Sequence, residues 1–177
     1  MKISRRKIDI LLIFVAIISI QTISFATIQT VAQAENDKKN ELLIQEADAV
    51  LNNEERETLN LINEYRKTNG LSELKPLASL QEVAKIKADD LALDYYFAHN
   101  SPTLGTPFEM LKDNGIEYKV AGENLAGNIT PERAANAWIN SPAHRDNILY
   151  DGYEYTGICV VESEVYGKIF VQLFMGI

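Results

Sequence analysis

Residues 153–174 read YEYTGICVVESEVYGKIFVQLF, and this stretch decides the class of fold. Its two halves, residues 153–162 and 168–174, are rich in Val, Ile, Tyr and Phe and are joined around residues 163–167. Such a pattern predicts a β-hairpin at the end of the chain. Residues 120–126 form a third candidate strand.

Helical periodicity precedes these strands. One helix is predicted from about Glu54 to a stop at Gly70, a second over residues 79–96, and a later one from Thr130 onward. Because helices come first and strands last, the order of elements predicts an α+β domain with helices packed on an antiparallel sheet.

A third helix has the clearest start signal. Thr106-Pro107-Phe108-Glu109 is a capping box with proline at the first helical position, and we expect Phe108 and Leu111 to form the apolar face of this helix. Ser141-Pro142 is interpreted as the cap of a further short helical turn that contains His144.

The N-terminus has the pattern of an export signal. An unbroken apolar core at residues 10–18 follows four basic residues, and Ala32-Gln33-Ala34 supplies a cleavage site. Residues 1–34 are therefore predicted to be a signal peptide, with an uncleaved membrane anchor as the alternative. Residues 35–53 are predicted to be a linker or accessory helix, and residues 54–177 the folded domain.

The chain is acidic. Removal of residues 1–34 takes away four of the 17 basic and one of the 25 acidic residues, which moves the formal charge from −8 to −11. Such a surface repels nucleic acids and anionic membranes, so neither is expected as the main partner, whereas cations and neutral ligands are compatible with it. The mature form is expected to have no integral membrane domain.

Cys159 is the only cysteine of the chain, so no intramolecular disulfide can form. It lies in the apolar run of residues 156–161, which favours a buried structural thiol over a nucleophile.

The chain contains only two histidines, and both lie beside the tripeptide Asn-Ser-Pro. His99 immediately precedes one copy, His144 follows the other after one residue, and Glu123 lies between them in Gly-Glu-Asn. Two imidazoles and a carboxylate are the components of a metal site or an acid–base site. On this pattern alone, surface histidines satisfied by local hydrogen bonds are an equally good interpretation.

Three motifs in order carry a resemblance to a known family: FAHNSP at residues 97–102, AGENLA at 121–126 and AWINSPAHRDNIL at 137–149. Together with LNLINEYR at 59–66 and the terminal strands, they resemble a bacterial CAP domain. This SCP-like superfamily comprises the cysteine-rich secretory proteins, antigen 5 and pathogenesis-related protein 1. The resemblance covers about residues 54–177.

The resemblance implies a three-layer α–β–α sandwich with a central antiparallel sheet. It also implies a cleft with two histidines and usually two acids, which binds a divalent cation in several members. His99, Glu123 and His144 match three of these positions. The fourth position, that of the second acid, is empty because Ile139 follows Trp138 here, and the disulfides of the family are absent too.

The implied cofactor is a divalent metal, Zn²⁺ first, with Mg²⁺ or another ion as alternatives. A helix start next to His144 disfavours its imidazolium form. Asn124, Ser141 and Arg145 are predicted to support the site.

The preferred function is a secreted bacterial binding or interaction module with an extracellular ligand in the cell wall, a lipid or a protein. The alternatives are a metal-dependent hydrolase of peptide or wall polymer and a lipid- or sterol-binding protein. Whether the protein is an enzyme is left open.

Overall fold

The structure is a computed structural model that describes residues 27–39, 42, 51–94 and 96–177. The chain divides into two compact units, Met1–Leu42 and Leu43–Ile177. In the first unit, residues 27–39 are helical and exposed, and this helix includes the predicted cleavage site. The basic and apolar parts of the predicted signal peptide, and part of the predicted linker, lie outside the described residues. Within the described ranges, no helix is long and apolar enough to cross a membrane.

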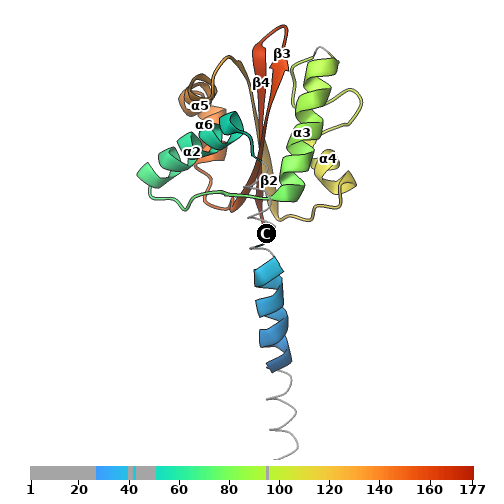
Figure 1. Cartoon of the computed structure of the whole chain (residues 1–177), viewed down its shortest axis with the longest axis vertical. Helices are drawn as coiled ribbons and strands as arrows, with labels where there is room; N and C mark the ends of the chain where they lie inside the picture. The colour runs from blue at the N-terminus through green and yellow to red at the C-terminus, as the bar shows by residue number, and fades with distance from the viewer. Residues whose placement is uncertain (1–26, 40–41, 43–50, 95) are drawn as a thin grey trace, which may run out of the picture. The chain divides into compact units, whose positions relative to one another are not determined.

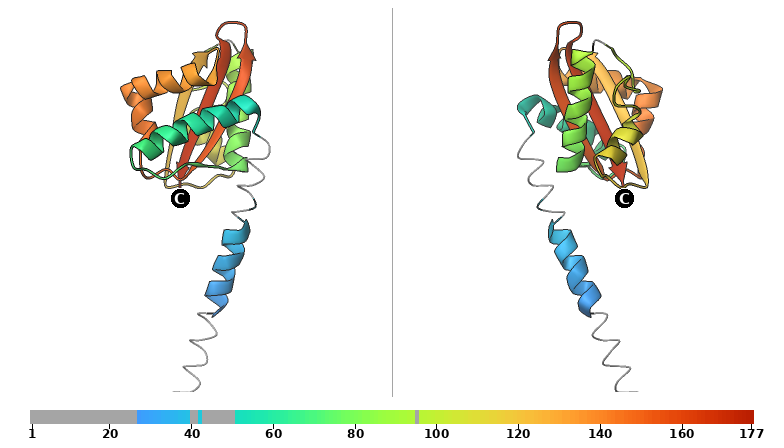
Figure 2. Two further views of the ribbon diagram at one scale, coloured as in Figure 1. Left: turned by 60° about the vertical axis from the view of Figure 1, so that its left-hand side comes forward. Right: turned by 90° about the vertical axis from the view of Figure 1, so that its right-hand side faces the viewer.

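The second unit is built of three layers (Figure 1). The helices α2, α5 and α6 cover one face of a sheet, and α3 and α4 cover the other, as the two views of Figure 2 also show. The three-layer α–β–α prediction is therefore confirmed. In chain order the elements are α2 (Asn53–Thr68), β1 (Lys75–Pro76), α3 (Ala78–Leu93), α4 (Pro107–Asp113), β2 (Val120–Asn128), α5 (Pro131–Asn140), α6 (Pro142–Ile148), β3 (Tyr155–Ser163) and β4 (Gly167–Gly176).

The sheet has the strand order β1-β3-β4-β2. β3 and β4 form the predicted hairpin, and β2 pairs with β4 in antiparallel fashion over its whole length. However, β1 runs parallel to β3, with Lys75 opposite Tyr155, so the sheet is mixed and the prediction of an antiparallel sheet is wrong at this edge. The strand β1 has only two residues, one of them Pro76, so it is too short for an alternating pattern that would predict it from sequence.

The central strand β4 separates two hydrophobic cores. Phe170 and Phe174 face α2 and α5, where they join Trp138, which is fully buried. Val171 and Leu173 alternate with them and face α3 and α4. Both faces of this strand are therefore buried, which explains its nearly continuous apolar sequence.

Cys159 belongs to the core on the α3 side. Its side chain is buried, and burial, with a smaller contribution from the charge of Glu55, raises the pKa of its thiol to about 12. The prediction of a buried structural thiol is confirmed.

Three helix boundaries can be compared with their predicted positions. The helix α2 begins with a capping box in which Asn52 accepts from the backbone of Glu54 and Glu55, and Gly70 follows the helix end with φ +77°, as predicted. The helix α3 ends at Leu93, three residues earlier than predicted. Its buried stripe stops at Leu91, and Leu93 is exposed, so no packing supports a longer helix.

The short helix α4 begins with the predicted capping box between Thr106 and Glu109. Its predicted apolar face is only half right. Leu111 is buried together with Met110, but Phe108 is 49% exposed. Phe108 instead forms a tilted ring pair with Tyr118, whose centroid lies 6.4 Å away.

Candidate functional site at the edge of the sheet

The structure brings His99 and Glu123 into direct contact. Nδ1 of His99 lies 2.7 Å from Oε1 of Glu123. The side chain of Glu123 is only 2% exposed, whereas that of His99 is 53% exposed. Because a carboxylate accepts and does not donate, Nδ1 of His99 carries a proton, and in the neutral form of the ring the lone pair is then on Nε2.

His99 lies in the loop that joins α3 to α4. This loop is closed on itself, because Ser101 and Gly105 exchange backbone hydrogen bonds of 2.8 and 3.2 Å. The hydroxyl of Ser101 accepts from the backbone of Thr103 and Leu104, which makes it the cap of this turn.

Glu123 has one oxygen without a partner among the described residues. Its Oε2 is buried, and none of their donors forms a hydrogen bond with it. Buried side-chain oxygens are nearly always paired, because an unpaired one loses its interactions with water and gains none in return. This oxygen is therefore an atom of the site at which a bound water molecule or another ligand would supply the missing interaction.

Asn124, the next residue of β2, binds the segment that carries His144. Side chains alternate between the two faces of a strand, so Asn124 points toward α5 and α6 while Glu123 points toward α3. Nδ2 of Asn124 donates to the backbone carbonyl of His144 at 3.0 Å. Asn147 donates in turn to Oδ1 of Asn124 and to the carbonyl of Glu123, at 2.9 and 3.2 Å.

His144 lies in the first turns of α6, as the Ser-Pro signal predicts. However, Ser141 makes no side-chain capping hydrogen bond, so the predicted capping role of its hydroxyl is wrong. Ser141 is also the residue that ends α5, and its backbone N–H donates to Ala137 and Trp138. Because Ser141 both ends α5 and precedes α6, its hydroxyl does not cap the N-terminus of α6.

Arg145 connects α6 to the end of α5. Its guanidinium donates to the carbonyl of Ile139 at 3.3 Å. This contact fits a supporting role, because it orients the helix that carries His144 and does not involve the His99–Glu123 pair.

The two histidines are electrostatically coupled across the edge of the sheet. The pKa of His144 is lowered, mainly by partial burial and also by repulsion from a charge on His99. Both effects favour a neutral imidazole, which has a lone pair for a ligand or a proton.

The fit of these residues to a metal ion can be tested on their geometry. Within the described ranges, no three or more His, Cys, Asp or Glu residues are gathered closely enough to count as a ready metal site. One oxygen of Glu123 is already bonded to His99. Glu123 is therefore placed to orient His99, as carboxylates do for ligating histidines, and not to act as a third equal ligand. The ligand set of His99, Glu123 and His144 stays a prediction.

One group near the site was not foreseen from sequence. Lys87 of α3 is fully buried and donates to backbone carbonyls of the His99 loop. The signal was present, because Lys87 falls on the apolar stripe of the helix between Ala84 and Leu91. A lysine at such a position is rarely buried without a partner.

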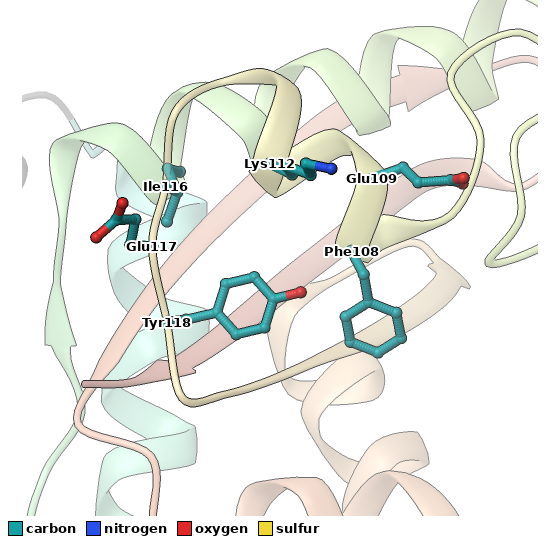
Figure 3. A pocket seen from close by; sticks show the side chains of 6 residues that line it. All are labelled: Phe108, Glu109, Lys112, Ile116, Glu117 and Tyr118. Carbon is teal, nitrogen blue, oxygen red and sulfur yellow. The ribbon is translucent and has the colours of Figure 1, made fainter.

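A hollow of about 550 Å³ lies elsewhere, around α4 (Figure 3). It is lined by Phe108, Glu109, Lys112, Ile116, Glu117 and Tyr118. None of the predicted site residues lines this hollow, so it is separate from the His99–Glu123 pair.

This three-layer fold and the motifs at its sheet edge define an SCP-like domain. Residues 59–174 match the family model described as CAP, the cysteine-rich secretory protein family. The chain belongs to this family, as the sequence motifs predicted.

Bacterial proteins are among its relatives. YkwD of Bacillus subtilis is 43% identical over 123 residues, which are 69% of this chain and 47% of YkwD. The membrane protein YlbC of Bacillus subtilis is 31% identical over 119 residues, 67% of this chain and 34% of YlbC. The chain thus spans half or less of the length of these relatives.

Two solved structures share the fold at 28% sequence identity. One is an extracellular protein with an SCP domain from Bacillus anthracis, with a TM-score of 0.65 over 75% of this chain and 43% of that chain. The other is an outer surface protein of Borrelia burgdorferi, with a TM-score of 0.62 over 67% of this chain and 88% of that chain. Both are described as extracellular or surface proteins.

Proposed function

We propose that this chain is an extracellular CAP-domain protein whose His99, Glu123 and His144 bind a divalent cation. It acts as a binding or interaction module at the cell surface. One observation carries the proposal, namely the buried carboxylate of Glu123 bonded to Nδ1 of His99, which leaves Nε2 of the same ring for a cation. A cation at Nε2 compensates the buried charge of Glu123 through the imidazole ring.

The side chains have distinct parts in this proposal. Glu123 fixes the tautomer of His99 and leaves Nε2 free, and the lowered pKa of His144 keeps its ring neutral at neutral pH. The two imidazoles would hold the ion, and Glu123 would act through its hydrogen bond to His99. Imidazole nitrogens favour Zn²⁺, whereas Mg²⁺ prefers oxygen ligands, so Zn²⁺ is the first candidate.

A bound Zn²⁺ would polarise a ligand oxygen and lower the pKa of bound water. Binding is proposed ahead of hydrolysis because the position after Trp138 that would supply a second acid holds Ile139. A hydrolase needs a group that moves protons besides the metal ligands, and Glu123 is engaged with His99.

The proposed location is outside the cell. The predicted signal at residues 1–34 supports it, and so does the description of two structural relatives as extracellular or outer surface proteins. The ligand is then an extracellular one, in the cell wall, in a lipid or in another protein.

Calorimetric titration of the purified chain with Zn²⁺ tests the proposal. We expect one site in the wild type and none in a His99→Ala, His144→Ala double variant. Glu123→Gln is expected to bind more weakly, because the neutral amide orients His99 but no longer attracts the ion. Equal binding by the wild type and the double variant would refute the site. Hydrolysis of peptide or wall polymer by the zinc-loaded protein would favour the alternative function.

A further inference from the structure

Lys87 is a buried cation with no ion pair among the described residues, although the more distant charges of Glu123 and Asp90 attract it. Its side chain has 0% exposure in the middle of the apolar stripe of α3, and burial lowers the pKa of its ammonium group. All three of its protons are used on neutral acceptors, namely the hydroxyl of Tyr96 at 2.8 Å and the carbonyls of Ala98 and His99 at 2.9 and 3.0 Å. Such a burial is costly, and an apolar side chain would fill this position more cheaply.

The acceptors of Lys87 show which part of the structure its buried ammonium group holds in place. Two of them are consecutive carbonyls, and the second belongs to His99 itself. The backbone on both sides of the His99 Cα atom is thereby tied to α3. The imidazole then reaches Glu123 with its Nδ1 at 2.7 Å, a contact that a loop displaced by 1 Å would lose.

A second residue of α3 ties the same loop from one turn further along. Asp90 accepts from the hydroxyl of Tyr96 and, at 2.8 Å, from the hydroxyl of Thr103. Lys87 and Asp90 thus hold the loop on both sides of His99, and they share Tyr96 as a common partner. Apart from one bridge, the described residues of the loop have no regular secondary structure. These side-chain bonds therefore fix its position together with the packing of Tyr96 and Leu104 on the α3-side core.

We infer that Lys87 is a positioning residue for the site: by binding the carbonyls of Ala98 and His99, it holds the His99 ring in register with Glu123. The contact between the two side chains is a property of the protein without any ligand. The consequence for cation affinity rests on the function proposed above.

The test compares two methionine variants of the same helix. Lys87→Met removes the ammonium group and keeps the shape of the side chain. Gln81→Met is the matched control, because Gln81 also binds backbone groups from α3, namely the N–H and carbonyl of Ile158 on β3, near the other end of the helix from the His99 loop. Both variants lose backbone hydrogen bonds, so both are expected to lower the melting temperature.

The first measurement is the imidazole ¹H–¹⁵N NMR spectrum without metal. The chain has only two histidines, so a His144→Gln background assigns both rings. We expect a slowly exchanging Nδ1–H of His99 in the wild type and in Gln81→Met, and its loss in Lys87→Met. The second measurement is Zn²⁺ affinity, expected to fall about 10- to 100-fold in Lys87→Met and to stay within about twofold in Gln81→Met.

The inference is overturned if folded Lys87→Met keeps the Nδ1–H resonance, or if Gln81→Met loses it too, since loss in both would reflect stability alone. If the wild type binds no Zn²⁺ while Lys87→Met still loses the resonance, the proposed function fails and the positioning role stands. Should Lys87→Met not fold, Lys87→Gln replaces it. Its shorter amide cannot reach both carbonyls, so the resonance is expected to be lost, and a folded Lys87→Gln that keeps it overturns the inference.

Discussion

Glu123 and Asn124 are consecutive residues of β2, and they hold the two histidine-bearing segments from opposite faces of the sheet. Glu123 binds the ring of His99 at 2.7 Å on the α3 side, and Asn124 binds the backbone of His144 at 3.0 Å on the α6 side. This is possible because β2 is an edge strand, so segments from both faces can meet around it.

This relationship makes Asn124 a stability determinant as well as a site residue. Asn124→Ala removes the donor to His144 and the acceptor for Asn147, and leaves buried groups unpaired. We expect a loss of about 1–3 kcal/mol in the free energy of unfolding. Urea denaturation measures it, with Asn140→Ala as the control. Asn140 is exposed and donates only within its own helix, so its variant should stay within about 0.5 kcal/mol of the wild type. Equal losses in both variants would contradict this role.

The consecutive helices α5 and α6 both begin with proline but differ in their caps. The hydroxyl of Thr130 accepts from the backbone of Arg133 at 3.3 Å, whereas Ser141 makes no such bond. Thr130→Ala should therefore cost about 1 kcal/mol of unfolding free energy. Ser141→Ala should cost no more than about 0.5 kcal/mol. Urea denaturation of both variants measures these losses. A loss of unfolding free energy for Ser141→Ala above about 0.5 kcal/mol would show that its hydroxyl does cap α6.

Sequence patterns predicted most of this fold for physical reasons. Capping boxes, proline at the first helical position and runs of β-branched residues are local signals, and α2, α4, α5 and the terminal hairpin all carry one. The parallel strand β1 is too short to have a pattern. The exposure of Phe108 depends on tertiary packing around α4, which no local rule contains.

The candidate site was located by its motifs, but its internal contacts were not. Sequence placed His99, Glu123 and His144 together as equal ligands. In the structure, one oxygen of Glu123 is used to orient His99, and Asn124 binds the backbone of His144, not a side chain. The role of Lys87 depends on the path by which the His99 loop folds back onto α3. The spacing of residues in the sequence does not reveal this path.

The folding stability should depend on pH through His144. Its pKa is lowered in the folded protein from an ordinary value of 6.5, so the folded state binds a proton there less readily than the unfolded chain. The corresponding stability is present above pH 6.5 and is lost as the pH falls through the lowered pKa. Urea denaturation at pH 7.5 and pH 5, with a chelator present, should show a larger loss for the wild type than for His144→Gln. Identical losses would mean that the environment of His144 does not disfavour its charge.

Cys159 should be unreactive in the folded protein. With its pKa raised from 9.0 to about 12, its thiolate fraction at pH 8 falls by about three orders of magnitude. A thiol reagent should label the protein rapidly in guanidinium chloride and very slowly without it. Cys159→Ala should cost about 1–2 kcal/mol and leave Zn²⁺ binding unchanged. Rapid labelling of the native protein would contradict the burial of this residue.

The most direct test of the account is to locate a bound ion. Crystals of the protein grown with Zn²⁺ and measured at the zinc absorption edge give an anomalous peak at each bound ion. We predict one peak between the two imidazoles, about 2.0–2.1 Å from Nε2 of His99 and from a ring nitrogen of His144, with Glu123 still bonded to Nδ1 of His99. A fully occupied zinc site elsewhere on the chain, with neither histidine bound to an ion, would contradict it.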